Sequence, residues 1–399
     1  MRLALLAPLP PEQTGIADHA AHCRRALNQA GVEVLTPLQG QRPPGSLSAA
    51  RAWVAERDWR RVDVVHAELG EGRLAEFYTL CALAERPDRP ALSATVHDPD
   101  RLVWQPSSGL GRWADTQPWL PRPLRSLLTG LSAPMGLLAE RRLARHLEGV
   151  AVHTQQGGQA LARRLKLRAD RLSVIPHGVQ PWPVRPLPQE PLRVLYFGFV
   201  HKGKGIEDLI DAMARLRARH ADDVGSIRLC IAGGSAPEVR RSHGREYLQA
   251  LRARIERRGL ATQVDWELDV DERDLPDLIQ RHHLVVLPHR RSWSPWARHT
   301  GTSGALAWAL ACGRGVIASD ARAFPEEIAL GLGACYPQGD VGALTATLLR
   351  AATEAGLMQQ WADKAAAVGV QRAWGINGQR FAGHMQRAVE RGQPGRATA

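Results

Sequence analysis

The sequence predicts an α/β protein made of two Rossmann-like domains, and three observations lead to this prediction. Short apolar runs that suit buried parallel strands alternate with amphipathic helical stretches along the chain. A proline-rich segment interrupts this alternation near the middle, and the alternation begins again at Arg193. The expected parts are a first domain at 1–180, a linker at 181–192, a second domain at 193–371, a C-terminal helix at 372–392 that packs back on the first domain, and a disordered tail at 393–399.

The composition is that of a globular protein with an excess of positive charge. The chain has 399 residues, of which 44% are hydrophobic, and a formal net charge of +12. Such a charge suits anionic ligands, acidic membranes or nucleic acid, and does not choose between them. The five cysteines are scattered without a CxxC pair, so a reduced, cytoplasmic protein without a cysteine-based metal site is the simplest interpretation. No apolar run approaches the roughly 20 residues of a membrane span.

The first half contains six predicted strands, at 3–7, 32–35, 62–66, 93–96, 150–152 and 172–175. Open α/β sheets bind ligands at the carboxyl ends of their strands. At these ends we expect Thr14-Gly15 after the first strand, at the start of a helix, and His66 and Glu68 just past the third strand. His97 and Asp98 follow the fourth strand. A histidine in such a place can be a capping or packing residue as well as a functional one. His97 is the better candidate, because its loop is acidic and contains a proline.

Residues 104–148 combine tryptophans, leucines and arginines on a helical pattern. A basic segment with Trp and Leu can lie on an anionic membrane surface. The alternative is an ordinary amphipathic helix that covers the sheet and turns its arginines to solvent. Both interpretations remain open at this point.

The second half contains predicted strands at 193–197, 229–234, 264–266, 284–287, 316–318 and 334–336. Lys202 and Lys204 lie in a glycine-rich loop before a helix, which is a good place to neutralise phosphate charge, although the Walker A spacing is absent. Thr302, Ser303 and Gly304 begin a later helix, whose free N–H groups and dipole favour a phosphate. Any βαβ unit needs a capped helix, so this last pattern also has a purely structural interpretation.

Loops that suit phosphate binding thus follow predicted strands in both halves. If the two sheet ends face each other, the ligand lies in a cleft between the domains.

Several short motifs, in order along nearly the whole chain, resemble those of a GT-B glycosyltransferase of the retaining family 4 type (glycosyltransferase group 1). Each motif is weak alone, and the ordered set is specific. The motifs are Thr14-Gly15-Ile16-Ala17-Asp18, Thr95-Val96-His97-Asp98, Ile175-Pro176-His177-Gly178-Val179, Phe197-Gly198 through Lys204-Gly205-Ile206, Ile231-Ala232-Gly233, and Leu287-Pro288 through Thr302-Ser303-Gly304-Ala305-Leu306 to Gly313.

The resemblance implies roles for individual residues. Gly15 would approach the donor diphosphate, Lys204 would neutralise it with help from Lys202, and the backbone of Thr302, Ser303 and Gly304 would hold phosphate. His97 would lie near the transferred sugar, so His97 and Lys204 are the predicted catalytic residues. The residues expected to bind the donor sugar or the acceptor are His66, Glu68, His97, Asp98 and Thr300.

Two departures from the family pattern concern the donor site. Phe199 stands where the family often has an arginine. The family's Glu-x7-Glu pair aligns on Thr300 and Trp308, and neither is acidic. The second glutamate usually holds the nucleotide ribose, so these departures leave the identity of the donor open. The sequence from Leu287 to Gly304 resembles a branch of the family without the first glutamate, so inactivity does not follow.

The predicted function is therefore retaining transfer of a sugar, most simply a hexose, from a nucleotide diphosphate sugar to a hydroxyl of a glycan or lipid-linked acceptor in bacterial-type polysaccharide or glycolipid assembly. Such chemistry needs stabilisation of the departing diphosphate, which lysines and helix N-termini can supply, so no metal or cofactor is expected. The expected location is the cytoplasm, at the inner face of the membrane. The main alternative is a catalytically inactive GT-B relative that acts as a binding or scaffold protein. Nucleic-acid binding is disfavoured, because no recognised motif is present and the charge is spread over both halves.

Overall fold

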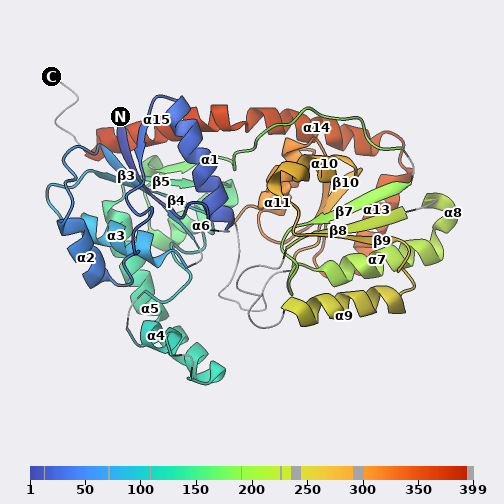
Figure 1. Cartoon of the computed structure of the whole chain (residues 1–399), viewed down its shortest axis with the longest axis horizontal. Helices are drawn as coiled ribbons and strands as arrows, with labels where there is room; N and C mark the ends of the chain where they lie inside the picture. Colours follow the sequence, from blue (N-terminus) through green and yellow to red (C-terminus); the bar gives the residue numbers. More distant parts are fainter. Residues whose placement is uncertain are drawn as a thin grey trace. The chain divides into compact units, whose positions relative to one another are not determined.

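The computed structural model describes residues 1–12, 14–70, 72–107, 109–117, 119–189, 191–224, 227–234, 244–290 and 301–392. The chain divides into two compact units. Unit 1 comprises Met1–Pro176 and Trp374–Ala399, and unit 2 comprises His177–Ala373. Each unit is built on one parallel sheet of six strands with helices on both faces (Figure 1), which confirms the predicted fold class of two Rossmann-like α/β domains.

The sheet of unit 1 has the strand order β2-β1-β3-β4-β5-β6. Its strands are β1 (Arg2–Leu6), β2 (Glu33–Leu35), β3 (Val64–Leu69), β4 (Ala91–Val96), β5 (Gly149–Val152) and β6 (Leu172–Val174). The chain begins with β1, one strand in from the edge of this sheet, forms β2 at that edge, and then crosses to the other side of β1. Loops after β1 and β3 therefore leave the sheet at a topological switch point, where open α/β sheets bind ligands.

Helices of unit 1 pack in two layers. The first layer is α1 (Gly15–Gln29) and α15 (Trp374–Gly392), and its apolar side chains pack on residues such as Leu3, Leu5 and Ala151. The opposite face of the sheet is covered by α2 (Leu47–Ala55), α3 (Leu74–Ala84), the C-terminal half of α5 (Arg122–His146) and α6 (Gln155–Leu165). The C-terminal helix thus belongs to unit 1, although the whole of unit 2 separates it from the rest of that unit in the sequence.

The short helix α4 (Gly109–Asp115) and the N-terminal part of α5 extend away from the sheet of unit 1 (Figure 1). They pack against each other, and Pro134 lies inside α5. No helix in the described part of the chain is long and apolar enough to cross a membrane.

The sheet of unit 2 has the order β12-β11-β10-β7-β8-β9, which is the Rossmann order 3-2-1-4-5-6 when its strands are counted within the unit. Its strands are β7 (Leu192–Phe197), β8 (Ile227–Gly233), β9 (Val264–Leu268), β10 (Leu284–Leu287), β11 (Gly315–Ser319) and β12 (Gly333–Tyr336). The switch point of this sheet lies between β7 and β10, so the loops that follow these two strands form its ligand-binding edge.

Helices α7 (Ile206–Arg219), α9 (Gly244–Arg257) and α13 (Val341–Thr353) cover one face of this sheet. The other face is covered by α10 (Leu275–Gln280), α11 (Gly304–Ala311) and α12 (Phe324–Ile328). Helix α14 (Leu357–Gln371) contributes Trp361 to the first core and Ala365 to the second, and the short α8 (Ala221–Val224) follows α7. Gly313, just after the C-cap of α11, has φ +58°, a conformation that glycine readily adopts at helix C-termini.

One predicted element is wrong in a way that matters for the site. The third strand does not end at His66 but continues to Leu69, so His66 and Glu68 lie inside β3 and not in the loop after it. Every residue of β3 is buried, because the strand pairs with β1 and β4 and is covered on both faces. Two polar residues in an apolar run resemble a strand end in the sequence, but here they are accommodated by polar neighbours on the next strand.

Candidate functional site

A group of polar side chains lies on the face of the unit 1 sheet that α1 and α15 cover. Side chains of a strand alternate between its faces, so His66 and Glu68 of β3 point to the same face as Ser93 and Thr95 of β4. None of these four side chains has exposed surface. Buried polar groups must find hydrogen-bond partners, so this face carries a polar network inside an otherwise apolar core.

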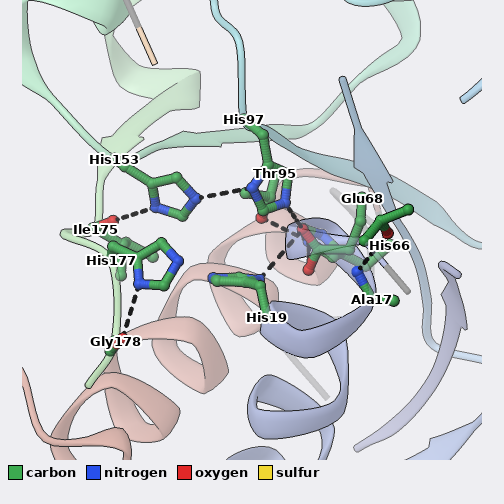
Figure 2. A network of polar contacts seen from close by, with 11 residues as sticks. Ala17, His19, His66, Glu68, Thr95, His97, His153, Ile175, His177 and Gly178 are labelled. Atoms are coloured by element: carbon green, nitrogen blue, oxygen red, sulfur yellow. Dashed lines mark hydrogen bonds and ion pairs between the residues drawn. The ribbon is translucent and has the colours of Figure 1, made fainter. Parts of the chain in front are cut away.

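His97, just past the end of β4, is where this network approaches the surface (Figure 2). Its Nε2 lies 2.7 Å from Oε2 of Glu68, a hydrogen bond between the imidazole and the carboxylate. Its Nδ1 lies 3.4 Å from Nε2 of His153, and Nδ1 of His153 donates to the carbonyl oxygen of Ile175 at 3.0 Å. The side chain of His97 is 11% exposed and that of Glu68 is 0% exposed. His97 can therefore contact a ligand, and Glu68 can act only through its neighbours.

His19 of α1 completes this cluster. Its Nδ1 lies 3.7 Å from Oε2 of Glu68, and its ring meets the rings of His97 and His153 edge to face at centroid distances of 4.8 and 5.0 Å. Neither His19 nor His153 was predicted from the sequence as a site residue. The signal for His19 was present, because a histidine at position 19 falls on the same helical stripe as Ile16 and Cys23, which face the core.

Three residues of this cluster could in principle ligate a metal. His19, Glu68 and His97 offer ligand atoms that all lie within 4.8 Å of one another. Two ligands of a tetrahedral zinc ion are separated by roughly 3.3 Å, given zinc–nitrogen bonds of about 2.0 Å. The separation of 2.7 Å between Nε2 of His97 and Oε2 of Glu68 is shorter and is that of a hydrogen bond. His97 and Glu68 are thus arranged as a hydrogen-bonded pair that shares a proton.

Gly70, at the end of β3, makes room for His97. A Cβ atom at Gly70 would lie 3.2 Å from Cβ of His97 and 3.1 Å from Cδ1 of Ile16. A side chain at this position would therefore push His97 or the first turn of α1 out of place. Asp98 follows His97 and is half-buried, whereas Gly15, the first residue of α1, is exposed with open space around it.

The second candidate group lies at the switch point of unit 2. The loop 198–205 connects β7 to α7, as predicted. Gly205 has φ +68°, and a Cβ atom there would lie 1.7 Å from the carbonyl oxygen of Pro288, so only glycine fits. The main-chain N–H of Arg290 donates to the carbonyl oxygen of Gly203 at 2.9 Å. These contacts join the loop after β7 to the loop after β10.

Positive charges gather around His289 in this region. Burial lowers the pKa of His289 well below its ordinary value, and the charges of Lys204, Arg322 and His201 lower it further. Arg322 also donates to the carbonyl oxygens of Gly301 and Thr302, at 3.2 and 2.9 Å, and so fixes the chain just before α11. Arg322 carries no sequence signal of its own, because only the fold brings the end of β11 beside the start of α11.

The residues of unit 2 that were predicted to bind the donor lie in the loop after β7 and around the start of α11. Lys204 is half-buried near His289, and Lys202 is exposed in the same loop. Ser303 is the N-cap residue of α11 but its side chain makes no capping hydrogen bond, and Gly304 is the first residue of the helix. The start of α11 therefore presents main-chain N–H groups that the Ser303 hydroxyl does not satisfy. Thr300 lies outside the described residues.

Comparison with known proteins gives one family and a set of related structures. Residues 183–368 match the model of the family "Glycosyl transferases group 1". No curated protein matches the chain by sequence. Solved structures that resemble it across nearly its whole length include a sucrose-phosphate synthase from Thermosynechococcus elongatus, with a TM-score of 0.67 and 18% identity over 97% of this chain and 98% of that one.

Two further structures were determined with a nucleotide or nucleotide sugar. HepE from Anabaena in complex with UDP has a TM-score of 0.62 and 18% identity over 97% of this chain and 100% of its own. An Escherichia coli structure described as trehalose-6-phosphate bound with UDP-2-fluoro glucose has a TM-score of 0.65 and 13% identity over 97% and 99% of the two chains. At these identities the structural likeness shows a shared fold, and the family match adds the class of protein. Residues 183–368 match the glycosyl transferases group 1 family, and the chain as a whole has a GT-B fold.

Proposed function

We propose that the chain is a retaining glycosyltransferase that transfers a sugar from a nucleotide diphosphate sugar to a hydroxyl group of a glycan or lipid-linked acceptor. The observation that carries this proposal is the start of α11, where the Ser303 side chain makes no capping hydrogen bond and Arg322 holds the carbonyl groups of Gly301 and Thr302. This helix start follows β10, whose loop is bonded to the loop that carries Lys204 at the switch point of the unit 2 sheet. A diphosphate leaving group needs fixed positive charge and N–H donors more than it needs a nucleophile, and this edge of the sheet offers both.

In this proposal Lys204 is the principal diphosphate contact and Lys202 assists from the exposed part of the same loop. Arg322 provides a further positive charge, which is relevant because Phe199, 42% exposed, stands where the family often has an arginine. The main chain of residues 302–304 would complete the phosphate site of unit 2. These groups are held in place before the donor arrives, so they stabilise developing negative charge without reorganisation.

Unit 1 would supply the contact to the transferred sugar through His97. With Nε2 bonded to Glu68, the ring of His97 is fixed in orientation. A sugar hydroxyl would donate to Nδ1 in place of the long contact of 3.4 Å that this atom makes with His153. Asp98 would line the same site. His66 and Glu68, which are fully buried, are better suited to orient His97 than to touch the sugar or the acceptor.

The donor is the first matter to test. Related structures were determined with UDP and UDP-2-fluoro glucose, so UDP-sugars are the first candidates. A thermal-shift screen with UDP-, GDP-, ADP- and dTDP-sugars should raise the melting temperature for one nucleotide class, because a ligand that binds only the folded state stabilises it. The same donor should then be hydrolysed or transferred. Binding without hydrolysis or transfer to any glycan or lipid acceptor would favour the non-catalytic scaffold instead.

We also propose that the projecting part of unit 1 contacts an anionic membrane. Large apolar side chains that are exposed on α4, on α5 and between them are Leu110, Trp113, Trp119, Leu124, Leu127, Leu131, Met135 and Leu138. Arg142 and Arg145 are exposed further along α5, and the whole chain is strongly basic. An apolar surface this large is unusual in the absence of a partner, and the neighbouring positive charge fits acidic headgroups. This surface would bring the enzyme to a lipid-linked acceptor in polysaccharide or glycolipid assembly.

A further inference from the structure

A continuous chain of buried polar contacts joins the C-terminal helix to His97. His384 of α15, whose side chain is fully buried, contacts Ser173 through Nδ1 and Ser93 through Nε2, each at 2.9 Å. Ser93 contacts Nδ1 of His66 at 3.1 Å, and Nε2 of His66 lies 2.8 Å from Oγ1 of Thr95.

The chain then reaches the carboxylate of Glu68. Nε2 of His66 lies 3.8 Å from Oε1 of Glu68, and the other carboxylate oxygen bonds His97. Four elements, β3, β4, β6 and α15, therefore contribute to a single polar path that ends at the partly exposed imidazole of His97. We propose that His384 is a positioning residue for His97, acting through Ser93, His66 and Glu68. This proposal rests on the role of His97 in the proposed function.

The two inner histidines are neutral, which constrains how the hydrogen bonds can run. Burial lowers the pKa of His66 well below its ordinary value, and burial together with the nearby charges of Arg387 and Arg391 lowers the pKa of His384 to about 3. A neutral imidazole has one N–H donor and one acceptor nitrogen. Each histidine therefore donates on one side and accepts on the other, and the hydroxyl of Ser93 between the two rings has one proton to give. If one ring takes that proton, the other ring must donate to Ser93.

Glu68 selects the direction. An ionised carboxylate accepts hydrogen bonds only, so its field favours the tautomer of His66 that carries the proton on Nε2, which lies 3.8 Å from Oε1 of Glu68. In this tautomer the Nε2–H donates to Oγ1 of Thr95 at 2.8 Å. Nδ1 of His66 must then accept from the hydroxyl of Ser93, and Ser93 must accept from the Nε2–H of His384. Finally, Nδ1 of His384 accepts from the hydroxyl of Ser173. Every N–H and O–H dipole from Ser173 to His66 points toward Glu68.

These aligned dipoles would stabilise the buried carboxylate, which otherwise loses hydration without full compensation. A stable Glu68 carboxylate in turn keeps the proton of His97 on Nε2 and fixes the plane of its ring. Removal of His384 frees His66 to adopt either tautomer, and the dipoles that point toward Glu68 are then no longer aligned. The ring of His97 would turn or change its tautomer, although no residue near the substrate has been altered.

The direction of the chain can be measured without any substrate. In protein labelled with ¹⁵N-histidine, the long-range proton–nitrogen correlations of each ring distinguish the two neutral tautomers. We expect the Nε2–H tautomer for both His66 and His384, assigned with His66→Gln and His384→Gln variants. In Ser93→Ala, the expected result is a mixture of tautomers at His66 and a changed pattern for His97. The Nδ1–H tautomer for either histidine in wild type would overturn the proposal.

Kinetics test the positioning role. His384→Leu and Ser93→Ala should each lower kcat by about tenfold with nucleotide affinity within about twofold, as is typical when an outer residue orients a reactive one. His384→Gln, whose amide can donate to Ser93 as Nε2–H does, should restore most of the rate. Met385→Leu, a volume-conserving change at the next buried position of α15, is the packing control and should leave kcat within about twofold.

The outcomes separate this proposal from the proposed function. If wild type turns over no donor, the proposed function fails, and the ring tautomers still decide whether the chain of hydrogen bonds exists. If wild type is active but His384→Leu and Met385→Leu lower kcat equally, the effect of His384 is one of packing and the positioning role is wrong. If the ring tautomers and kcat of Ser93→Ala are the same as in wild type, the positioning role of His384 is also wrong.

Discussion

Nε2 of His97 lies 2.7 Å from Oε2 of Glu68, and Glu68 is the fully buried member of this pair. The carboxylate thus lies behind the imidazole and orients it, while the exposed edge of the ring remains for a ligand. His97 is therefore the residue that can touch a substrate, and Glu68 is the residue that orients it.

His97→Ala should lower kcat by about two orders of magnitude while nucleotide affinity stays within a few-fold. The contact of His97 with the sugar would strengthen as the anomeric carbon becomes cationic, whereas the diphosphate contacts lie on the loops of unit 2. The measurement is the rate per folded molecule, with affinity determined on the same sample. A normal rate per folded molecule would remove His97 from the active site and leave it a residue that caps its strand.

Lys204→Ala should weaken nucleotide binding and slow transfer by about 100-fold, the effect of losing one preorganised charge contact. The half-buried position of Lys204 beside His289 makes its charge count for more than an exposed one. Titration with the donor nucleotide and steady-state kinetics measure the two effects. The matched control is Lys364→Ala, an exposed lysine on α14, which should leave both quantities unchanged. Equal affinity and rate in Lys204→Ala would mean that the phosphate site is elsewhere.

Leu127→Ser combined with Leu131→Ser should weaken the binding of the protein to anionic vesicles by at least about 30-fold. The two side chains are 58% and 65% exposed on α5, and each would lose roughly 1–2 kcal/mol of transfer free energy into the lipid interface. Co-sedimentation with vesicles of acidic and of zwitterionic lipids measures the effect, and high salt should weaken binding of wild type by screening the arginines. The control carries Leu330→Ser and Val370→Ser, two exposed apolar positions of unit 2. Vesicle binding that neither the Leu127/Leu131 change nor salt alters would leave this segment without a membrane role.

Stability should fall as the pH drops below about 6.5, and His384 should account for part of the fall. Burial lowers the pKa of His384 to about 3, so the unfolded chain takes up a proton between pH 6.5 and 3 that the folded chain refuses. The stabilisation is therefore complete above the unfolded pKa and decreases by up to about 1.4 kcal/mol per pH unit below it. Chemical denaturation at pH 7, 6 and 5 should show a shallower decline for His384→Gln than for wild type. Parallel declines would mean that His384 titrates normally in the fold.

Arg314→Met should lower the free energy of unfolding by at least about 3 kcal/mol, because it leaves several carbonyl oxygens without donors. The Arg314 side chain has no exposed surface and donates to the carbonyl oxygens of His282 at 2.8 Å, Gln280 at 2.9 Å and Arg185 at 3.1 Å. Arg350→Met, which removes an exposed ion pair with Glu354, should cost less than about 1 kcal/mol. Chemical denaturation compares the two, and equal losses would contradict the structural role of Arg314.

The sequence by itself determined the parts that depend on local chemistry. The strands at 284–287 and 193–197, the loop Gly198 to Gly205 and the C-terminal helix were predicted with boundaries within about two residues of those observed, because short apolar runs, glycines and helix periodicity are properties of neighbouring residues. His97 was likewise placed correctly at a strand end. Motifs in order along the chain also indicated the family whose model matches residues 183–368.

Only the tertiary structure decided which of these residues meet. His66 and Glu68 look like the end of a strand in the sequence, yet they lie within β3 because the sheet buries that strand on both faces. His19, His153 and His384 are far apart in the sequence and carry no shared motif. They join one network because α1 and α15 cover the same face of the sheet and His153 follows β5 beside them. Burial and hydrogen-bond partners are properties of that packing. The tautomers of the histidines could therefore not be predicted before the fold was known, nor could it be predicted which residue can touch a substrate and which residues only orient it.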